Sequence, residues 1–178
     1  NENFESTNPE YSWFADDAQM DIHYSNPLQN TSNSSNYVLQ YEDVGGDFAN
    51  VGFDYGENFD LSATHQFSLM IYVSSFTVTG NSPNQISLKL QNANIAAPWS
   101  TQTEIIKTID LDQWQTVTFD FNNDNYINLD PNSQPPSQRN DLNRLILQVN
   151  GEDNTDQVTA YIDDFIYTSD APPADDGD

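Results

Sequence analysis

The chain has 178 residues, which is enough for one well-buried core but cramped for two domains. Its 28 Asp and Glu residues against four Lys and Arg residues give a formal net charge of −24, which argues against nucleic acid and membrane insertion as modes of binding. Cysteine is absent, so disulfides, thiolate metal sites and cysteine nucleophiles are excluded.

Apolar and polar residues alternate over short segments along the chain, which is the period of half-buried strands. This pattern predicts strands near residues 37–42, 49–54, 67–73, 85–91, 103–109, 116–121, 145–150 and 158–167, with one more around Phe4. Turn-forming segments separate them, and no long amphipathic helix intervenes. We therefore expect an all-β fold, an antiparallel β-sandwich or jelly roll of about 8 to 10 strands, formed by residues 1–169 as a single domain.

The two ends of the chain suggest an exported protein with further domains. Residues 170–178 combine prolines with acids, which is typical of an extended linker between domains. Residues 1–5 lack the features of a signal peptide, so we expect the sequence to begin after one or inside a longer protein. The chain is thus expected to act as a monomeric part of a secreted or cell-surface protein, covalently linked to catalytic or surface domains.

The sequence gives little sign of catalysis. No two Glu residues fall two or four positions apart within a predicted strand, where they could flank a glycosidic bond. His23, in an Asp-rich loop, and His65, in a turn before a strand, lack the spacing of metal ligands. No Gly-x-Ser-x-Gly nucleophile elbow occurs. We therefore predict that the chain is not an enzyme.

A calcium site is predicted near the last strand. Asp163 and Asp164 interrupt an otherwise apolar segment, where an unpaired carboxylate would be costly and a hard cation would compensate its charge. The alternative is that one of the two faces solvent. Strand alternation does not decide which, because Ile162 shares a face with Asp164 whereas Phe165 shares one with Asp163.

Tryptophans are the first candidates for ligand contact. Trp99 follows a proline in a connection between two strands, where an exposed indole could stack on the apolar face of a sugar; packing within the loop is the alternative. Trp114 opens an alternating strand and is expected in the core. Trp13 belongs to an N-terminal loop that must pack on something, so it is a reserve candidate.

Polar side chains on two predicted strands could bond a ligand. Lys89 and Gln91 project from the face opposite Ile86, Leu88 and Leu90, and Gln148 alternates with apolar neighbours on another strand. Amides and an ammonium on such a face can bond sugar hydroxyls, although an ordinary solvated surface has the same pattern.

Three segments in order along the chain resemble a known family. Phe4-Glu5, the run from Trp114 to Phe119 and the run from Tyr161 to Phe165 are similar to jelly-roll carbohydrate-binding modules with a galactose-binding-like fold. Residues 26–53 resemble modules carried by secreted polysaccharide-utilisation proteins of marine Bacteroidetes. The resemblance implies a structural Ca²⁺ held by Glu5 and Asp163, with Asp164 as the alternate ligand. It also implies a glycan site on a concave sheet or its rim.

The leading hypothesis is a non-catalytic module that attaches its parent protein to an algal polysaccharide. The contacts expected are Trp99, Lys89, Gln91, Gln148 and, in reserve, Trp13. A neutral β-glucan such as laminarin is the first choice, because a chain of this charge would repel sulfated or uronic polymers. The alternatives are a β-sandwich lyase or glycoside hydrolase, and a calcium-stabilised adhesion or spacer domain.

Overall fold

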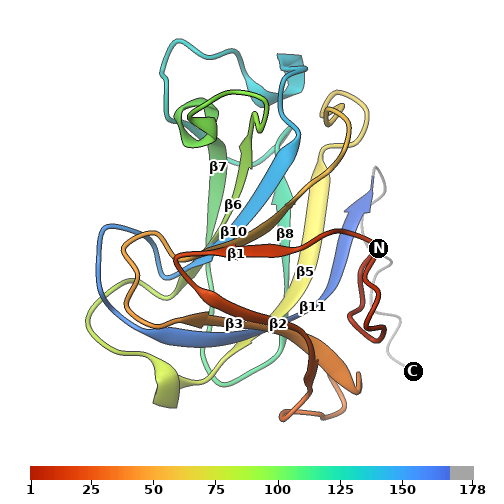
Figure 1. Ribbon diagram of the computed structural model, residues 1–178, viewed down its shortest axis with the longest axis vertical. Coiled ribbons are helices and arrows are strands. Elements are labelled where there is room, and N and C mark those ends of the chain that lie inside the picture. Colours follow the sequence, from red (N-terminus) through yellow and green to blue (C-terminus); the bar gives the residue numbers. More distant parts are fainter. Residues whose placement is uncertain (169–178) are drawn as a thin grey trace.

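The computed structural model describes residues 1–168, which form two antiparallel sheets packed face to face (Figure 1). The first sheet has six strands in the order β1-β4-β10-β6-β7-β9. Their bounds are β1 Phe14–Asp16, β4 Asn50–Asp54, β6 Gln85–Gln91, β7 Thr103–Thr108, β9 Ile127–Asn128 and β10 Arg144–Val149.

The second sheet has five strands in the order β2-β3-β11-β5-β8. Their bounds are β2 Gln19–Ser25, β3 Tyr37–Asp43, β5 Gln66–Val73, β8 Gln115–Asp120 and β11 Val158–Thr168, and three short 3-10 turns complete the described elements: η1 Ser75–Thr77, η2 Pro98–Thr101 and η3 Pro136–Gln138. The all-β antiparallel sandwich predicted from the alternation is confirmed.

The core lies between the sheets and is made by alternate residues of facing strands. Leu88 and Leu147 point inward from the six-stranded sheet, and Ile71 points inward from the other; all three are fully buried. Aromatic rings fill one end, where Phe53 and Phe165 meet edge to face with their centroids 5.6 Å apart. The inward-facing side chains of these strands are apolar and most of the outward-facing ones are polar, which explains the alternation in the sequence.

The N-terminal quarter differs from the expectation. Residues 19–25, assigned to a loop around His23, form the edge strand β2, and Phe4 lies outside any strand with a φ of 56°. A single bridge between Glu2 and Phe165 takes the place of the strand expected there. β2 lacks fully buried positions because it lies at the edge of its sheet, so its apolar signal is weak.

A β-bulge in β11 decides which of Asp163 and Asp164 faces the core and which faces solvent. The register against β5 shifts between Asp163 and Ile166, and Asp164 has a left-handed φ of 45°. The bulge turns Asp163 inward, where it is 0% exposed, and leaves Asp164 exposed, while both Ile162 and Phe165 remain in the core.

Two further expectations concern the chain outside the sandwich. Within residues 1–168, no helix is long and apolar enough to span a bilayer. The linker predicted for residues 170–178 lies outside the described residues.

Candidate functional site

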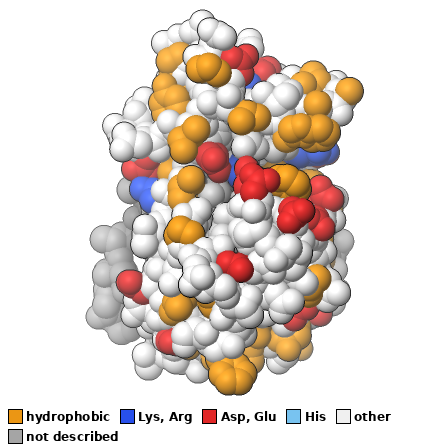
Figure 2. Space-filling view, turned by 90° about the vertical axis from the view of Figure 1, so that its left-hand side faces the viewer, with side chains coloured by type: hydrophobic (Ala, Val, Ile, Leu, Met, Phe, Trp, Pro, Cys, Tyr) orange, Lys and Arg blue, Asp and Glu red, His pale blue; other side chains and the backbone are white. Residues whose placement is uncertain are grey.

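The outer face of the six-stranded sheet carries a mainly polar set of side chains. Strand register places Ile146, Lys89 and Glu104 side by side across β10, β6 and β7. The next row contains Gln148 and Ser87. In Figure 2, which faces this side of the molecule, acidic side chains gather near the middle of the surface, bordered by hydrophobic ones.

Lys89, predicted as a sugar contact, lies at the centre of this face and is only 3% exposed, so the alternative of an ordinary solvated lysine does not apply. Its Nζ is 2.7 Å from the Glu152 carboxylate and 3.9 Å from that of Glu104. Burial raises the pKa of Glu104, an effect that the neighbouring ammonium opposes. One cation therefore joins two carboxylates that are far apart in sequence.

Trp99 lies on the short 3-10 turn η2, which follows β6. Pro98 occupies the first position of the turn, and the Thr101 hydroxyl donates to the Pro98 carbonyl at 2.7 Å. Arg139 donates to the Thr101 carbonyl at 2.8 Å, which attaches the turn to the loop after η3. The indole is 61% exposed, so the turn is anchored while the ring is free to meet a ligand.

A cavity of about 380 Å³, here called the tryptophan cavity, joins three of the predicted contacts. Trp99, Lys89 and Gln91 all line it, with Gln102 accepting a hydrogen bond from Gln91 at 3.1 Å. Its full lining is Asp16, Phe48, Asn50, Lys89, Gln91, Trp99, Gln102, Leu129 and Glu152. The side-chain amides of Gln91 and Gln102 form the floor of this cavity, and its rim is partly apolar.

Two members of the apolar rim, Phe48 and Leu129, were not predicted, because they lie on loops far from Trp99 in the sequence. Phe48 is 48% exposed, and its backbone N–H donates to Asp17 at 2.9 Å. Leu129 is 54% exposed, and its N–H donates to the Gln102 carbonyl at 3.0 Å. Together with Trp99, these side chains give the cavity apolar surfaces on which a ring could lie.

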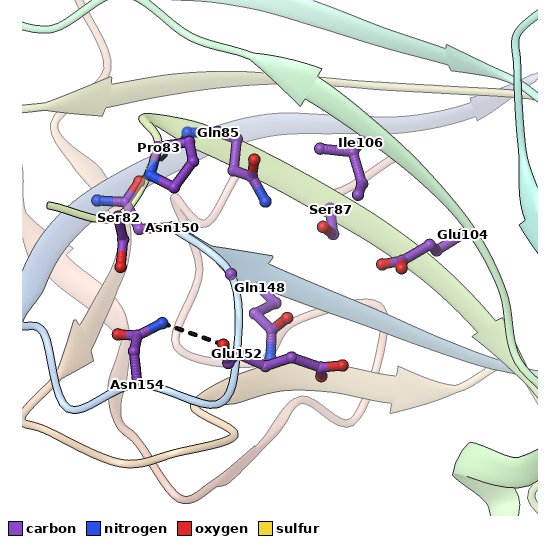
Figure 3. Close-up of a pocket in the computed structure, with 11 residues that line it drawn as sticks. Ser82, Pro83, Gln85, Ser87, Glu104, Ile106, Gln148, Asn150, Glu152 and Asn154 are labelled. Atoms are coloured by element: carbon purple, nitrogen blue, oxygen red, sulfur yellow. Dashed lines mark hydrogen bonds between the residues drawn. The ribbon is translucent and has the colours of Figure 1, made fainter. Parts of the chain in front are cut away.

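A second cavity of about 340 Å³, here called the amide cavity, shares Glu152 with the first. Figure 3 shows Gln148, Glu104 and Glu152 directed into this space. Ser87 and Asn150 also line it. We call the two adjoining cavities the groove. Gln148 thus belongs to the same face as the other predicted contacts but lies in the neighbouring compartment, with its amide donating to Asn50 at 3.1 Å.

Trp13 lies away from the groove and packs against the core. Its ring centroid is 4.9 Å from that of Phe53, 5.6 Å from that of Phe4 and 5.8 Å from that of Phe165.

The two histidines also lie away from the groove. A ring nitrogen of His23 is 2.9 Å from the Phe4 carbonyl. That of His65 is 2.7 Å from Asp120. Their contacts are those of structural side chains.

The residues predicted to bind calcium lie close to where the chain enters and leaves the fold. Asp163 accepts hydrogen bonds from the Asn33 side chain and from the Asp164 N–H, both at 2.8 Å. Glu5 accepts from the N–H groups of Asn36 and Tyr37 at 2.7 and 3.2 Å. Burial raises the pKa of Asp163 to about 6. Burial and the nearby Glu5 charge also raise the pKa of Asp164.

These residues fit a calcium site in part. All four basic side chains are engaged with other carboxylates, so the buried charge of Asp163 is matched by hydrogen bonds alone. However, residues 1–168 contain no group of three or more His, Cys, Asp or Glu side chains arranged to hold a metal ion. An ion here would need backbone carbonyls and amide oxygens to complete its shell, which calcium accepts.

The two antiparallel sheets form a jelly-roll sandwich, a fold that is also found in carbohydrate-binding modules. No protein-family model and no curated protein sequence matches the chain. The family 11 carbohydrate-binding module of the cellulase Lic26A-Cel5E of Clostridium thermocellum superposes with a TM-score of 0.55 at 13% identity, over 92% of this chain and 89% of that one.

Two further solved structures show the same architecture. A family 11 module from Clostridium thermocellum in complex with a β-1,3-1,4-mixed-linked tetrasaccharide gives a TM-score of 0.52 at 12% identity, over 87% of this chain and 86% of that one. An exo-β-agarase gives 0.60 at 12% identity, over 97% of this chain. This chain spans 25% of the agarase but most of each module. At such identities the likeness is one of fold.

Proposed function

We propose that the chain is a non-catalytic carbohydrate-binding module whose groove holds a polysaccharide. The observation that carries the proposal is the tryptophan cavity, where Trp99 and Phe48 rise beside a floor containing Gln91 and Lys89. Sugars present apolar ring faces and polar edges, so an aromatic rim above amides and charged groups suits them. The structural neighbours that match over most of their length are carbohydrate-binding modules, which supports the same function.

A neutral glycan is the proposed ligand, with a β-glucan such as laminarin as the first choice. The chain carries a net charge of −24, and Asp16 and Glu152 line the cavity that contains Trp99, so a polyanion would be repelled. The likeness to a module solved with a mixed-linked β-glucan oligosaccharide supports a glucan. The likeness to an agarase makes agarose the second choice.

The same proposal places the module in a secreted or cell-surface protein, where it attaches linked domains to an algal polysaccharide. Individual sugar contacts on an open groove are weak, so linked modules would raise the retention of the parent protein through avidity. The likeness to about a quarter of an agarase is consistent with a module that accompanies other domains.

Calcium belongs to the proposal as a structural ion beside Asp163. The buried carboxylate, its raised pKa and the proximity of Glu5 to Asp164 support it, because a cation would offset all three charges. The ion would fasten the first residues of the chain to β11.

A second candidate is a glycoside hydrolase. Glu104 and Glu152 come from different parts of the chain, yet both line the amide cavity and both approach Lys89. Paired carboxylates in a cleft are the machinery of glycosidases. The shared ammonium argues against this candidate, since Lys89 Nζ already pairs with both carboxylates, at 2.7 and 3.9 Å, instead of leaving them free to flank a glycosidic bond.

Retention on glycans tests the proposal. The chain is run in affinity electrophoresis and calorimetry against laminarin, mixed-linkage β-glucan, agarose, carrageenan, alginate and fucoidan, and released reducing ends are measured in parallel. Binding to a neutral glycan without new reducing ends supports the module. Reducing ends that vanish in Glu104→Gln would establish the hydrolase instead. Failure to bind any of the six polymers would leave the adhesion or spacer domain.

A further inference from the structure

Among the residues that line the described groove, Lys89 is the one basic side chain, and it sits at the centre of the sheet. A lysine ammonium in such a place would ordinarily act as a point charge for phosphate, sulfate or carboxylate groups. Here Glu152 at 2.7 Å and Glu104 at 3.9 Å surround it, so its charge is already more than matched.

Glu152 owes its position to an unusual loop. Asn150, Gly151 and Asp153 all have left-handed φ values, of 61°, 81° and 59°. The two that carry side chains, Asn150 and Asp153, belong to the residue types that adopt this region most readily after glycine, so the sequence of the loop suits its conformation.

Hydrogen bonds hold this loop in place. The Asp153 N–H donates to the Asp47 carbonyl at 2.8 Å, and the Asn154 amide donates to the Glu152 carbonyl at 3.2 Å, as the dashed line in Figure 3 shows. The loop thereby holds the Glu152 carboxylate over the face of the sheet, between the two cavities.

We propose that Glu152 sets the charge selectivity of the groove: by occupying the Lys89 ammonium it makes the site accept neutral glycans and reject sulfated or uronic ones. This inference rests on the proposed function, because it concerns the same groove. An anion approaching Lys89 meets the fixed carboxylate of Glu152 first, and repulsion between like charges acts strongly in a partly buried site.

Glu152→Gln tests the inference, because the amide keeps the shape of the side chain and can still accept a bond from Lys89. The ratio of affinity for carrageenan or alginate to affinity for laminarin is expected to rise at least about tenfold, and further in Glu104→Gln/Glu152→Gln. The gain should shrink in 0.5 M NaCl, since screening weakens a charge effect. Glu57→Gln is the matched control, because it changes the net charge equally at an exposed carboxylate that lines neither cavity.

The double variant Lys89→Met/Glu152→Gln distinguishes two effects of Glu152→Gln. One is that the Lys89 ammonium, no longer paired with Glu152, can bind an anion, and the other is that the groove simply loses a negative charge. The gain is expected to disappear in this variant, while a gain that persists would overturn the inference. So would an unchanged ratio in Glu152→Gln, or wild-type protein that prefers carrageenan or alginate. In these cases binding of laminarin by the wild type leaves the proposed function standing, whereas no binding of any glycan refutes that function itself. Melting temperatures establish that each variant is folded.

Discussion

The sharpest test of the groove is Trp99→Ala. An indole presents roughly 200 Å², and the ring is 61% exposed. A sugar covering one face of the free part would bury about 60 Å², worth about 1.6 kcal/mol at 25 to 30 cal/mol per Å². The variant is therefore expected to bind laminarin roughly 15-fold more weakly. Isothermal titration calorimetry measures this loss directly, and affinity electrophoresis provides a second reading.

Phe76→Ala is the matched control for Trp99→Ala. Phe76 is also an exposed aromatic residue on a 3-10 turn, with 96% of its side chain free, but it lines neither cavity of the groove. Its loss is expected to leave glycan affinity unchanged, and neither variant should move the melting temperature appreciably because both rings project into solvent. If Trp99→Ala bound within twofold of the wild type, or if Phe76→Ala lost as much, the assignment of the tryptophan cavity would be wrong.

Three further predictions concern stability. The melting temperature of the wild type is expected to be higher in calcium than in EGTA, because calcium at a thousandfold excess over its Kd would stabilise the folded state by up to about 4 kcal/mol. The melting temperature of Asp163→Asn should not respond to calcium, and equal rises in both proteins would contradict the site. In EGTA, burial holds the pKa of Asp163 at about 6 against an ordinary 3.8, so the folded state binds the proton more tightly than the unfolded state. The free energy of unfolding of the wild type, relative to that of Asp163→Asn, should therefore fall by about 3 kcal/mol as the pH rises from about 4 to about 6, as measured by urea titration. If the two proteins showed the same dependence on pH, the raised pKa of Asp163 would be contradicted. Phe165→Ala removes a fully buried ring and is expected to cost roughly 3 to 5 kcal/mol in denaturant unfolding, against less than about 0.5 for Phe76→Ala; similar costs would disprove the placement of the core.

Alternation predicted the strands whose two faces have different environments. β5 and β10 each turn an apolar set of side chains into the core, as the sequence pattern predicts, although in β10 the outward-facing Ile146 and Gln148 are buried as well. The edge strand β2 has no such contrast and was missed. The bulge at Asp164 depends on a left-handed aspartate, which a pattern of apolar residues does not reveal.

Four of the residues that line the groove were predicted: Lys89, Gln91, Trp99 and Gln148. Trp99 could be predicted because it follows a proline in the segment between two strands. Gln91 could be predicted because its amide lies on the polar face of a strand. Glu152 and Phe48 were not predicted, because β10 pairs between β4 and β6 and so brings together residues about a hundred positions apart. A signal for Glu152 did exist: its turn contains Asn150 and Gly151, which tolerate a left-handed backbone, directly after a strand that faces the site.

The backbone pairing of Glu2 with Phe165 determines where the chain enters and leaves the sandwich. The backbone groups of these two residues exchange hydrogen bonds at 2.8 Å, so the chain enters and leaves the sandwich at one place. That place adjoins β11 on the right of Figure 1, whereas β6, β7 and β10 lie toward the left. Residues 2 and 165 therefore meet on the side of the sandwich away from the groove, so the entry and exit of the described chain leave the surface proposed to bind a glycan uncovered.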